Sequence, residues 1–326
     1  MDNQQNINAP KVSVIVPFFR VEKYIGKCAL SLMQQTLEDL ELIFVDDCGG
    51  DESADILQKV IEQYPDRDVK VIKLGHNSGV SAARARGIEM AKGEYIGFCD
   101  SDDWVAPEMY QTLYEAAHQH EADIVGCGFV EHKEGQKTAV RFDAEEDSEA
   151  TVFSFNHFGG VYGALWNKII RREFFNKYNE HLGEGLSMWE DSLTIIPLRL
   201  KSSKTVFLSK CLYHYNVNEN SNTIKFSMQK VNDSIEATKR LEHYFQQYGY
   251  QSNARALMNC LKINAKEVLL RYPERENLQL WRETFTESRS ALWQYPQWNV
   301  MLKMRAYLVS VLPFGLAMIV LRWMRK

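Results

Sequence analysis

The residues with the clearest chemical potential are four consecutive positions, Asp100-Ser101-Asp102-Asp103, which follow an apolar run at 95–99. Asp100 and Asp102 are two residues apart, so both carboxylates can face one hard cation. Mg²⁺ or Mn²⁺ held by few protein oxygens keeps coordination sites for phosphate. The alternative is a solvated turn that caps the next helix. A place at the end of a buried strand favours the metal, because α/β sheets bind ligands beyond the carboxyl ends of their strands.

A second acidic pair, Asp46-Asp47, ends the apolar run at 40–45. A carboxylate at that place can accept hydrogen bonds from a nucleobase N–H or a ribose hydroxyl, although both residues could instead form a turn. Residues 75–87 supply a loop and a helix start with Arg84 and Arg86. An arginine near a helix N-terminus suits a diphosphate, a role that we favour for Arg84, while Arg86 fits a solvated helix face.

Two common nucleotide-binding motifs are missing from the sequence. No G-x-G-x-x-G follows the first apolar run at 11–19, and no G-x-x-x-x-G-K-[ST] occurs anywhere. The first absence weakens a dinucleotide-binding interpretation, and the second removes P-loop nucleotide hydrolases.

Alternating strands and helices must position these acidic pairs. Short β-branched apolar runs predict strands at 11–19, 40–45, 69–74 and 95–99, and apolar residues at helical spacing predict helices at 25–35, 53–64 and 80–91. This order is typical of an α/β fold with a doubly wound, mostly parallel sheet. We therefore expect the acidic residues at one edge of that sheet.

The remainder of the chain is expected to complete this domain and add a helical region. The patterns predict a helix at 107–120, a strand at 123–129, a polar meander or surface loop at 131–150, helices around a loop at 164–175 and 183–200, and a strand at 206–216. After about residue 226 only helical patterns remain, at 235–248 and 254–270. We expect a catalytic domain at 1–225 and a helical C-terminal region at 226–326.

Composition narrows the function classes. The 326 residues carry a net charge of −5 and are 45% hydrophobic, which is ordinary for a globular protein, and the sequence pI near 6.0 argues against a nucleic-acid binder. The six cysteines are scattered without a C-x-x-C pair, so neither a disulfide framework nor a zinc cluster is supported. Residues 1–10 lack an apolar stretch, so we expect no signal peptide and a cytoplasmic protein.

Four ordered segments together resemble family 2 glycosyltransferases, which are inverting enzymes of the GT-A fold. They lie at 12–53, 77–110, 166–175 and 183–193, and the resemblance covers roughly residues 10–225. It implies a metal-dependent transfer of a sugar from a nucleoside diphosphate, usually UDP, to a saccharide or lipid-linked saccharide during surface polysaccharide synthesis.

The resemblance also implies roles for the residues at the strand ends. Pro17, Phe19 and Asp47 would hold the base and ribose with Asp46 beside them, and Arg84 would lie beside the nucleotide. Asp100 and Asp102 match the D-x-D motif, with Asp102 as the direct ligand of Mn²⁺ or Mg²⁺, Asp100 nearer the ribose, and Ser101 in the same nucleotide pocket. The metal would bridge the two phosphates and offset the charge on the departing UDP.

Glu190-Asp191 matches the E-D motif of the family, whose aspartate is the general base. An acceptor hydroxyl has a pKa far above 7, so a carboxylate must take its proton as it attacks the anomeric carbon. We expect Asp191 to be the base and Glu190 to position the acceptor or the base, although spacing alone also allows a charged helix face. Trp189 beside them could stack on a sugar ring or pack in the core.

The sequence departs from the family pattern at three places. The usual D-D-G-S-T-D reads DDCGGD at 46–51, the asparagine of A-R-N-x-G is Arg86, and a late Y-x-Y-R segment ends in Asn216. If the missing arginine holds the diphosphate in the family, His214 or Lys168 would have to substitute for it. The carboxylates of the expected base and metal site are unchanged.

The last 28 residues differ from the rest in charge. Residues 299–326 contain five basic and no acidic residues, whereas the whole chain has 38 basic and 43 acidic ones. The uncharged stretch 306–321 is shorter than the roughly 20 residues that span a bilayer. We expect an interfacial helix on the inner face of the membrane, with Trp298, Tyr307 and Trp323 at headgroup depth. The alternative is a helix packed on protein. A membrane site would suit an acceptor carried on a polyprenyl diphosphate, which the resemblance also suggests.

Two other functions stay open on the sequence. A nucleotidyltransferase also places acidic strand ends around a metal, but it would need a Gly-rich basic loop where residues 18–26 read FFRVEKYIG. A non-catalytic scaffold with this fold is the other alternative, and the presence of Asp102 and Asp191 argues against it.

Overall fold

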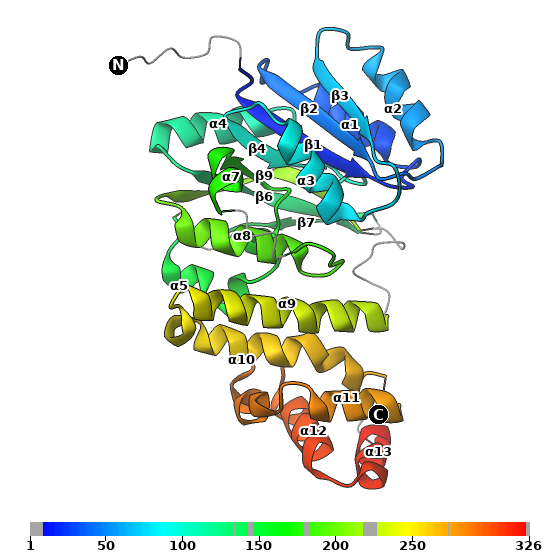
Figure 1. The fold of residues 1–326 in the computed structure, drawn as a ribbon, viewed down its shortest axis with the longest axis vertical. Helices are drawn as coiled ribbons and strands as arrows, with labels where there is room; N and C mark the ends of the chain where they lie inside the picture. The colour runs from blue at the N-terminus through cyan, green and yellow to red at the C-terminus, as the bar shows by residue number, and fades with distance from the viewer. Residues whose placement is uncertain are drawn as a thin grey trace. The chain divides into compact units, whose positions relative to one another are not determined.

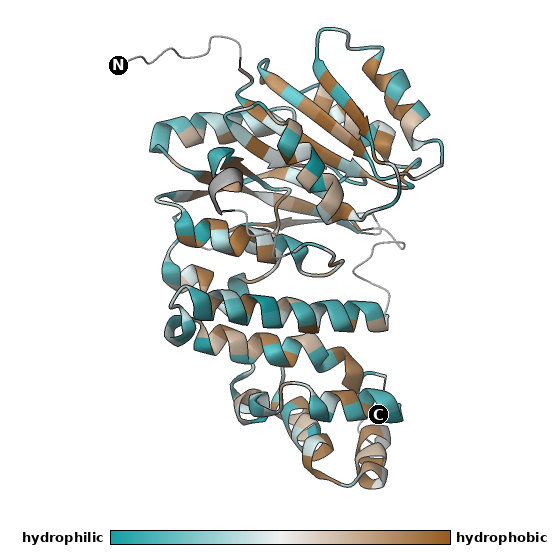
Figure 2. Cartoon of the chain, in the orientation of Figure 1, coloured by the Kyte–Doolittle hydropathy of each residue, from teal (hydrophilic) through white to brown (hydrophobic). Residues whose placement is uncertain are grey.

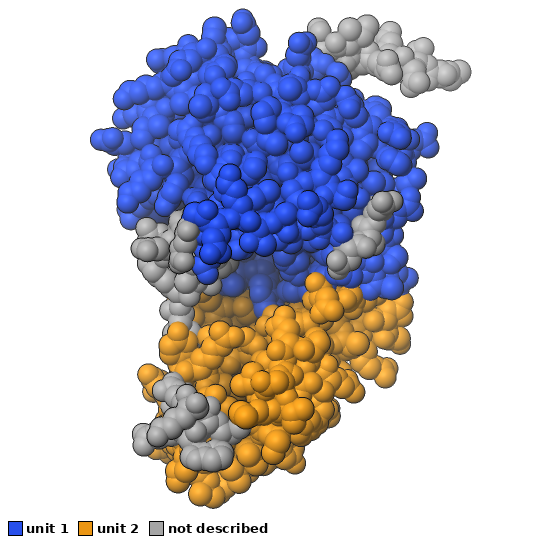
Figure 3. Space-filling model, turned by 180° about the vertical axis from the view of Figure 1, so that it is seen from behind, with its two compact units in different colours: residues 1–152, 157–225 blue, residues 153–156, 226–326 orange. Residues whose placement is uncertain are grey.

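The protein is described here from a computed structural model that covers residues 9–133, 135–142, 146–178, 183–217, 227–272 and 274–323. It forms two compact units, one of residues 1–152 with 157–225 and one of residues 153–156 with 226–326 (Figure 3). Residues 153–156 thus belong to the second unit although they precede it in the chain. The expected boundary at 225/226 lies in the segment 218–226, outside the described residues.

Among the described residues, nine strands form the sheet of the first unit, which Figure 1 shows as arrows. They are β1 (Val12–Phe18), β2 (Leu40–Asp46), β3 (Asp68–Lys73), β4 (Tyr95–Phe98), β5 (Trp104–Val105), β6 (Ile124–Lys133), β7 (Gln136–Val140), β8 (Lys168–Arg171) and β9 (Thr205–Asn216).

The sheet is mixed, with the order β3-β2-β1-β4-β8-β6-β9-β5 and with β7 paired to β6. Its first four strands run parallel to one another. Strand β8 is antiparallel to both β4 and β6, and β9 is parallel to β6. The expected α/β fold is present, with the parallel arrangement concentrated in the N-terminal half of the chain.

Helices of the first unit cover both faces of this sheet. They are α1 (Ile25–Met33), α2 (Ser53–Ile61), α3 (Val80–Met90), α4 (Met109–His120), α5 (Glu149–Val152), α6 (Gly160–Gly163), α7 (Glu173–Tyr178) and α8 (Glu190–Lys201). Side chains alternate across a strand, so Val14 of β1 packs with α1 and α4, whereas its neighbour Ile15 packs with α3 and α8. Burial on both faces explains why β1 and β2 read as continuous apolar runs.

Three segments differ from their predicted structure. Residues 164–175 are not one helix, because Lys168–Arg171 form strand β8 between β4 and β6. A short apolar run gives no reliable periodicity, and here sheet pairing decides its conformation. Residues 131–140 form the hairpin of β6 and β7, not a polar loop throughout. Within the described part of 183–200, the helix begins only at Glu190.

The second unit is helical. It contains α9 (Met228–Gln247), α10 (Gln251–Glu267), α11 (Arg275–Glu283), α12 (Val300–Val311) and α13 (Phe314–Trp323), with 3₁₀ segments at Val268–Leu270 and Thr286–Gln294; a further 3₁₀ turn lies at Phe155–His157. Trp281 and Tyr295 are among the largest side chains buried there. Lys266 is also buried, and its Nζ donates to the carbonyl oxygens of Trp281, Thr284 and Phe285. The Lys266 ammonium therefore holds a turn within this unit.

Candidate active site

Parallel pairing brings the acidic strand ends to one edge of the sheet. Phe18 of β1 is opposite Asp46 of β2, and Ile15 is opposite Phe98 of β4. The next backbone amides continue the pairing, since Asp47 N–H donates to the Phe18 carbonyl and Cys99 N–H donates to the Ile15 carbonyl. The residues that follow each strand are therefore fixed relative to one another by backbone hydrogen bonds.

Arg84 of α3 links the two catalytic motifs expected from the sequence. Its Nη1 donates to Oδ1 of Asp191 at 2.5 Å and lies 3.5 Å from Oε1 of Glu190. Its Nη2 donates to Oδ1 of Asp100 at 3.1 Å. The Arg84 side chain is buried, whereas the three carboxylates keep partial contact with solvent. One guanidinium thus contacts the start of the D-x-D segment and both members of the E-D pair.

Negative charge exceeds positive charge in this cluster. Burial alone would lower the pKa of Arg84, but the carboxylates of Asp191, Asp100 and Glu190 outweigh it and raise that pKa. Burial, reinforced by Asp191, raises the pKa of Glu190 to about 7. Burial raises the pKa of Asp100 to about 6, with Arg84 opposing and Asp191 and Asp102 adding to the shift. An additional cation would relieve this repulsion.

The turn before α8 sets the direction of the E-D pair. Trp189 immediately precedes the helix and has φ 65°, a left-handed conformation that is costly for a non-glycine residue. A Cβ at Gly183 would lie 2.8 Å from the carbonyl oxygen of Glu190, so only glycine permits this close approach. Oδ2 of Asp191 accepts the Leu165 N–H at 3.3 Å, which leaves Oδ1 for Arg84.

The D-x-D segment is held from behind by strand β9. The Tyr213 hydroxyl accepts the Asp100 N–H at 3.1 Å and donates to Oδ2 of Asp103 at 2.7 Å. The Asn216 N–H donates to Oδ1 of Asp103 at 2.7 Å, and Asn216 Nδ2 donates to the Asp102 carbonyl at 3.3 Å. Burial, followed by the charges of Asp102 and Asp100, raises the pKa of Asp103.

Asp103 and Tyr213 were not among the site residues expected from the sequence. Their sequence signals were the fourth residue of the D-S-D-D run and the first tyrosine of the late Y-x-Y segment. Only the structure joins them, because they lie 110 positions apart in the chain. Asn216, which stands where the resemblance implied an arginine, is part of the same hydrogen-bond network.

Asp46 and Asp47 shape the loops at the second strand end. Asp46 Oδ1 accepts the Gly49 N–H at 3.1 Å. Asp47 accepts the backbone N–H groups of Ser78 and Gly79 at 2.7 and 2.8 Å, just before α3 begins. Both aspartates are buried, so these contacts fix the loop around them. Whether either also contacts a nucleoside stays a prediction.

The other expected nucleotide residues lie at the same strand ends. Pro17 is buried within β1, and Phe19 directly after it is exposed beside the Arg20 guanidinium, which lies 5.0 Å from its ring centre. Ser101 is buried inside the D-x-D turn. Phe19 exposes apolar surface here, and its contact with a base stays a prediction.

Three residues were expected to contact the acceptor or the diphosphate: Lys168, His214 and Trp189. Each of them has other partners in the structure. Lys168 is fully buried, and its Nζ donates at 2.7 Å to Val161 O, Ala164 O and Asn167 Oδ1. This placement does not support a diphosphate ligand, because the ammonium holds backbone in the core.

His214 and Trp189 are half-buried. His214 Nδ1 lies 3.0 Å from His132 Nε2, and its ring stacks on Trp104. Burial and the neighbouring His132 lower the pKa of His214 to about 4, so it is neutral near pH 7 and cannot replace a cationic arginine. Trp189 packs edge-to-face on Phe158 at 5.2 Å.

The donor set at Asp100 and Asp102 fits a hard divalent cation. Both side chains are carboxylates, and burial, with the charges of Asp191 and Asp102 adding to it, raises the pKa of Asp100 although Arg84 opposes the shift. Among the described residues no cluster of three or more His, Cys, Asp or Glu side chains is arranged around one point. Two protein carboxylates with phosphate oxygens would suit Mg²⁺ or Mn²⁺, which keep several non-protein ligands.

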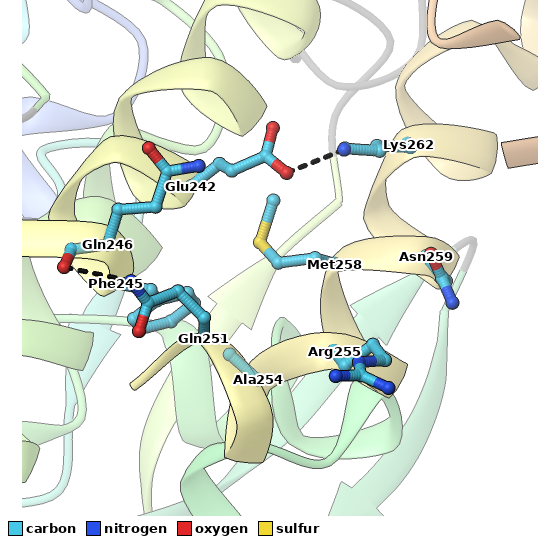
Figure 4. A pocket seen from close by; sticks show the side chains of 9 residues that line it. All are labelled: Glu242, Phe245, Gln246, Gln251, Ala254, Arg255, Met258, Asn259 and Lys262. Atoms are coloured by element: carbon cyan, nitrogen blue, oxygen red, sulfur yellow. Dashed lines mark hydrogen bonds and ion pairs between the residues drawn. The ribbon is translucent and has the colours of Figure 1, made fainter. Parts of the chain in front are cut away.

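A cavity of about 120 Å³ lies elsewhere, in the second unit between α9 and α10 (Figure 4). Glu242 and Lys262 face each other at its rim as an ion pair of 2.6 Å. Gln251 also bonds across it, to the carbonyl of Gln246. These four residues thus pair with one another, and the cavity is lined by none of the expected site residues. We do not assign the chemistry to it.

No helix in the described ranges combines the length and the apolar character needed to cross a bilayer.

All six cysteines are free thiols. Cys28 and Cys99 approach with their sulfur atoms 3.8 Å apart behind the D-x-D turn.

Comparisons with known proteins show the family and the fold. The model of the family described as glycosyl transferase family 2 matches residues 13–179. The uncharacterized glycosyltransferase EpsJ of Bacillus subtilis is 36% identical over 221 residues, which cover 66% of this chain and 63% of EpsJ. The matched region therefore spans less than two thirds of that relative.

Two solved structures share the fold. Residues 1–349 of Staphylococcus aureus TarS, solved in complex with UDP-GlcNAc, match with a TM-score of 0.73 at 18% identity, covering 97% of this chain and 91% of that one. The mannosyltransferase PcManGT of Pyrobaculum calidifontis, in complex with GDP-Man and Mn²⁺, matches with a TM-score of 0.55 at 15% identity, covering 98% and 88%. At these identities the likeness shows the fold alone.

Proposed function

Because the chain belongs to glycosyltransferase family 2, we propose that it transfers a sugar from a nucleoside diphosphate donor to an acceptor hydroxyl with inversion. The observation that carries this proposal is the contact of Arg84 with Asp100, Glu190 and Asp191. The donor-side motif and the expected base thus lie within the reach of one guanidinium. In this reaction the acceptor oxygen loses its proton as it attacks the anomeric carbon, and the diphosphate leaves the same carbon. The base and the donor-binding residues must therefore lie close together.

Asp191 is the general base in this proposal. Its carboxylate takes the proton of the acceptor hydroxyl while that oxygen bonds to the anomeric carbon, and the bond from that carbon to the diphosphate breaks on the opposite face. The nucleoside diphosphate leaves with the electron pair. Glu190, whose pKa is raised to about 7, positions the acceptor or the base.

Arg84 positions the base. Its Nη1 and Nη2 are directed to carboxylates, and its bond to Asp191 orients one oxygen while the Leu165 N–H holds the other. This differs from a direct contact with a diphosphate, which the position of Arg84 near a helix start had suggested. The raised pKa of Arg84 fits a guanidinium held by carboxylates.

The donor is proposed to be a UDP-sugar, bound with a divalent metal. Asp100 and Asp102 would hold Mn²⁺ or Mg²⁺, which supplies charge compensation for the leaving diphosphate. Tyr213, Asp103 and Asn216 keep that turn in place. Support for the donor comes from TarS, solved with UDP-GlcNAc, and support for the metal from PcManGT, solved with Mn²⁺.

The acceptor is proposed to be a saccharide, free or carried on a lipid such as a polyprenyl diphosphate, in surface polysaccharide synthesis. A lipid-linked acceptor would require the protein to work at the inner face of the membrane. The excess of basic residues at 299–326 supports such a location.

A calorimetric titration of UDP, GDP, ADP and TDP with and without Mn²⁺ tests the proposal. Selective binding of UDP that depends on Mn²⁺ is the expected outcome. Preference for another diphosphate would keep the transferase and change the donor. If no diphosphate binds, a non-catalytic scaffold of the same fold replaces the proposal.

A further inference from the structure

Helix α12 turns a stripe of large apolar side chains toward solvent. Val300, Met304, Tyr307 and Val311 follow one another at spacings of four, three and four residues, so they lie on one helix face. Their exposed fractions are 65%, 48%, 45% and 52%. Soluble proteins normally place polar residues on such a face, and a contiguous apolar patch indicates a binding surface.

The opposite face of α12 already belongs to the core of its unit. Ala306, Val309 and Ser310 are buried. The Ser310 hydroxyl accepts the Trp281 Nε1–H at 3.0 Å, and the Val309 carbonyl accepts a hydrogen bond from Arg282. The orientation of the helix is therefore fixed by its inner face, and the outer stripe is not needed for packing within the unit.

Helix α13 carries further exposed apolar side chains. Ala317 and Leu321 are buried, whereas Leu316 and Ile319 are 51% and 63% exposed. Figure 2 shows the brown, apolar ribbon of α13, and Figure 1 shows it beside α12, which it follows after the turn at Pro313. We call the exposed side chains of Val300, Met304, Tyr307, Val311, Leu316 and Ile319 the apolar face.

The segment that carries this face is basic in sequence. Its described basic side chains are Lys303 and Arg305, and Arg305 Nη2 donates to the Leu270 carbonyl at 3.0 Å. Residues 299–326 contain five Lys and Arg residues and no acidic residue. Lys303 Nζ donates to the Trp293 carbonyl at 2.8 Å, and the Trp293 side chain is half exposed. Exposed tryptophan and lysine beside apolar residues are typical of segments that lie at the level of lipid headgroups.

We propose that the apolar face inserts into the surface of an anionic bilayer, with α12 and α13 lying in the interfacial plane. This inference rests on the proposed function only in assuming a lipid-linked acceptor. A second copy of the chain fits less well, because a symmetric contact would bring the basic segments of both copies together. The lipid surface offers the complementary negative charge.

The inference changes the membrane contact expected from the sequence. The stretch 306–321 is not one helix, since α12 ends at Val311 and α13 starts at Phe314. Trp298 does not face outward, because its ring packs on Trp281 and Tyr295 and its Nε1–H donates to Glu267. Tyr307 remains on the face, and the side chain of Trp323 lies outside the described residues.

Vesicle co-sedimentation of the full-length protein tests this face. We expect binding to vesicles of phosphatidylcholine with 30% phosphatidylglycerol and weak binding to pure phosphatidylcholine. The double variant Met304→Glu/Tyr307→Glu should lower the partition coefficient on anionic vesicles by at least about tenfold, because it adds charge to the inserted side chains. Both side chains are half exposed, so the fold should tolerate the change.

Tyr272→Glu is the matched control, because Tyr272 and Tyr307 belong to the same unit and are both 45% exposed. The control should bind vesicles as the unchanged protein does. Equal loss in both variants, or no loss in the double variant, overturns the proposal. If the protein does not bind vesicles but forms a dimer by light scattering, and the double variant is monomeric, the face binds a second copy and the proposal is overturned. A monomer that does not bind vesicles also overturns the proposal.

UDP titration of the same variants separates this inference from the transfer reaction. The double variant should retain the UDP affinity of the unchanged protein. If UDP fails to bind any of these proteins while vesicle binding follows the expected pattern, the transferase is refuted and the membrane face stands. If the proteins bind UDP but not vesicles, the membrane face is refuted and the transferase stands.

Discussion

Arg84 Nη1 donates to Asp191 Oδ1 at 2.5 Å although 107 positions separate the two residues in the chain. Arg84 is placed by α3, which packs against β1 and β2, and Asp191 by the first turn of α8. The same guanidinium reaches Asp100 at the end of β4. The buried guanidinium of Arg84 therefore connects α3, the start of α8 and the end of β4, which are separate motifs in the sequence.

Replacing Asp191 by Asn should abolish most of the transfer. The asparagine amide cannot take the proton of the substrate hydroxyl, so we expect kcat to fall by about 10²–10⁴-fold, the usual contribution of a general base. UDP affinity, measured by calorimetry, should stay within about twofold. Glu89→Gln on the exposed face of α3 is the control. Near-normal turnover of Asp191→Asn would mean that the base is another residue.

Arg84→Lys should reduce kcat more than it changes the UDP affinity. Lysine keeps one charge but cannot contact three carboxylates, so Asp191 loses its fixed orientation and kcat should fall by about tenfold or more. Arg84→Met leaves the carboxylates unpaired, and removing one partner of a buried pair costs about 3–5 kcal/mol of stability. Steady-state kinetics and UDP titration separate the two effects.

Arg86→Met is the control for Arg84, since Arg86 lies on the same helix but is exposed and pairs only with Glu89 among the interactions described for it. It should behave as the unchanged protein. A strong loss of UDP affinity in Arg84→Lys with kcat retained would assign Arg84 to the diphosphate and refute its role at the base.

Asp102→Ala should remove the dependence of UDP binding on Mn²⁺. Loss of one of two carboxylate ligands weakens the hold on a hard cation, so the affinity in Mn²⁺ should drop to the metal-free value. Chelation of the unchanged protein should have the same effect. The exposed Asp66, replaced by Ala, is the control. Undiminished Mn²⁺-dependent binding would exclude Asp102 as a ligand.

Tyr213→Phe should loosen the D-x-D turn. The variant loses the hydrogen bonds to Asp103 and Asp100, and we expect about 1–3 kcal/mol less unfolding free energy by urea titration. UDP affinity in Mn²⁺ should weaken several-fold, because Asp100 is no longer held. Tyr110→Phe, which removes a longer bond of 3.4 Å to the Phe98 carbonyl, should cost less and leave UDP binding unchanged. Unchanged UDP affinity in Tyr213→Phe would limit the tyrosine to stability.

Glu190 makes stability depend on pH. Its pKa in the folded protein is raised to about 7 from the ordinary 4.5, so the folded state holds the proton more tightly than the unfolded one. That stabilisation is complete below pH 4.5 and is lost as the pH rises through 7. In EDTA, unfolding free energy should thus fall by at most about 3 kcal/mol between pH 4.5 and 7.5 from this group.

The variant Glu190→Gln should flatten this part of the pH profile, measured by urea unfolding at pH 5, 6, 7 and 8. Asp100 contributes a slope of the same sign at slightly lower pH, since its pKa is raised to about 6, so some dependence should persist. A profile for Glu190→Gln that matches the unchanged protein would show that Glu190 ionises normally.

The sequence was sufficient for the parallel half of the fold. Strands β1, β2 and β4 and helices α1, α2 and α3 lie within a few residues of their predicted bounds. Their signals are local, because a strand buried on both faces is apolar throughout and its helix carries an apolar stripe. The site carboxylates could be found for the same reason, since they directly follow buried strands or match ordered motifs.

Contacts between distant segments were beyond the sequence. The strand at Lys168–Arg171 depends on pairing with β4 and β6, and without those partners its short apolar run is equally compatible with a helix. Lys168 was expected from the sequence as a possible substitute for the missing arginine, but β8 and α6 bury it against three oxygen acceptors. Periodicity says which face of an element is apolar, not which neighbour covers it.

The sequence by itself determined the family, the acidic residues at the strand ends and the basic, apolar C-terminal segment, because each is carried by consecutive residues. Only the tertiary structure decided that Arg84 contacts Asp191, that Tyr213 holds the D-x-D turn through Asp103, and that Tyr307 faces outward while Trp298 packs inward. The physical reason is that a charge or hydrogen bond acts over a few ångströms of space, and folding sets that distance independently of separation along the chain.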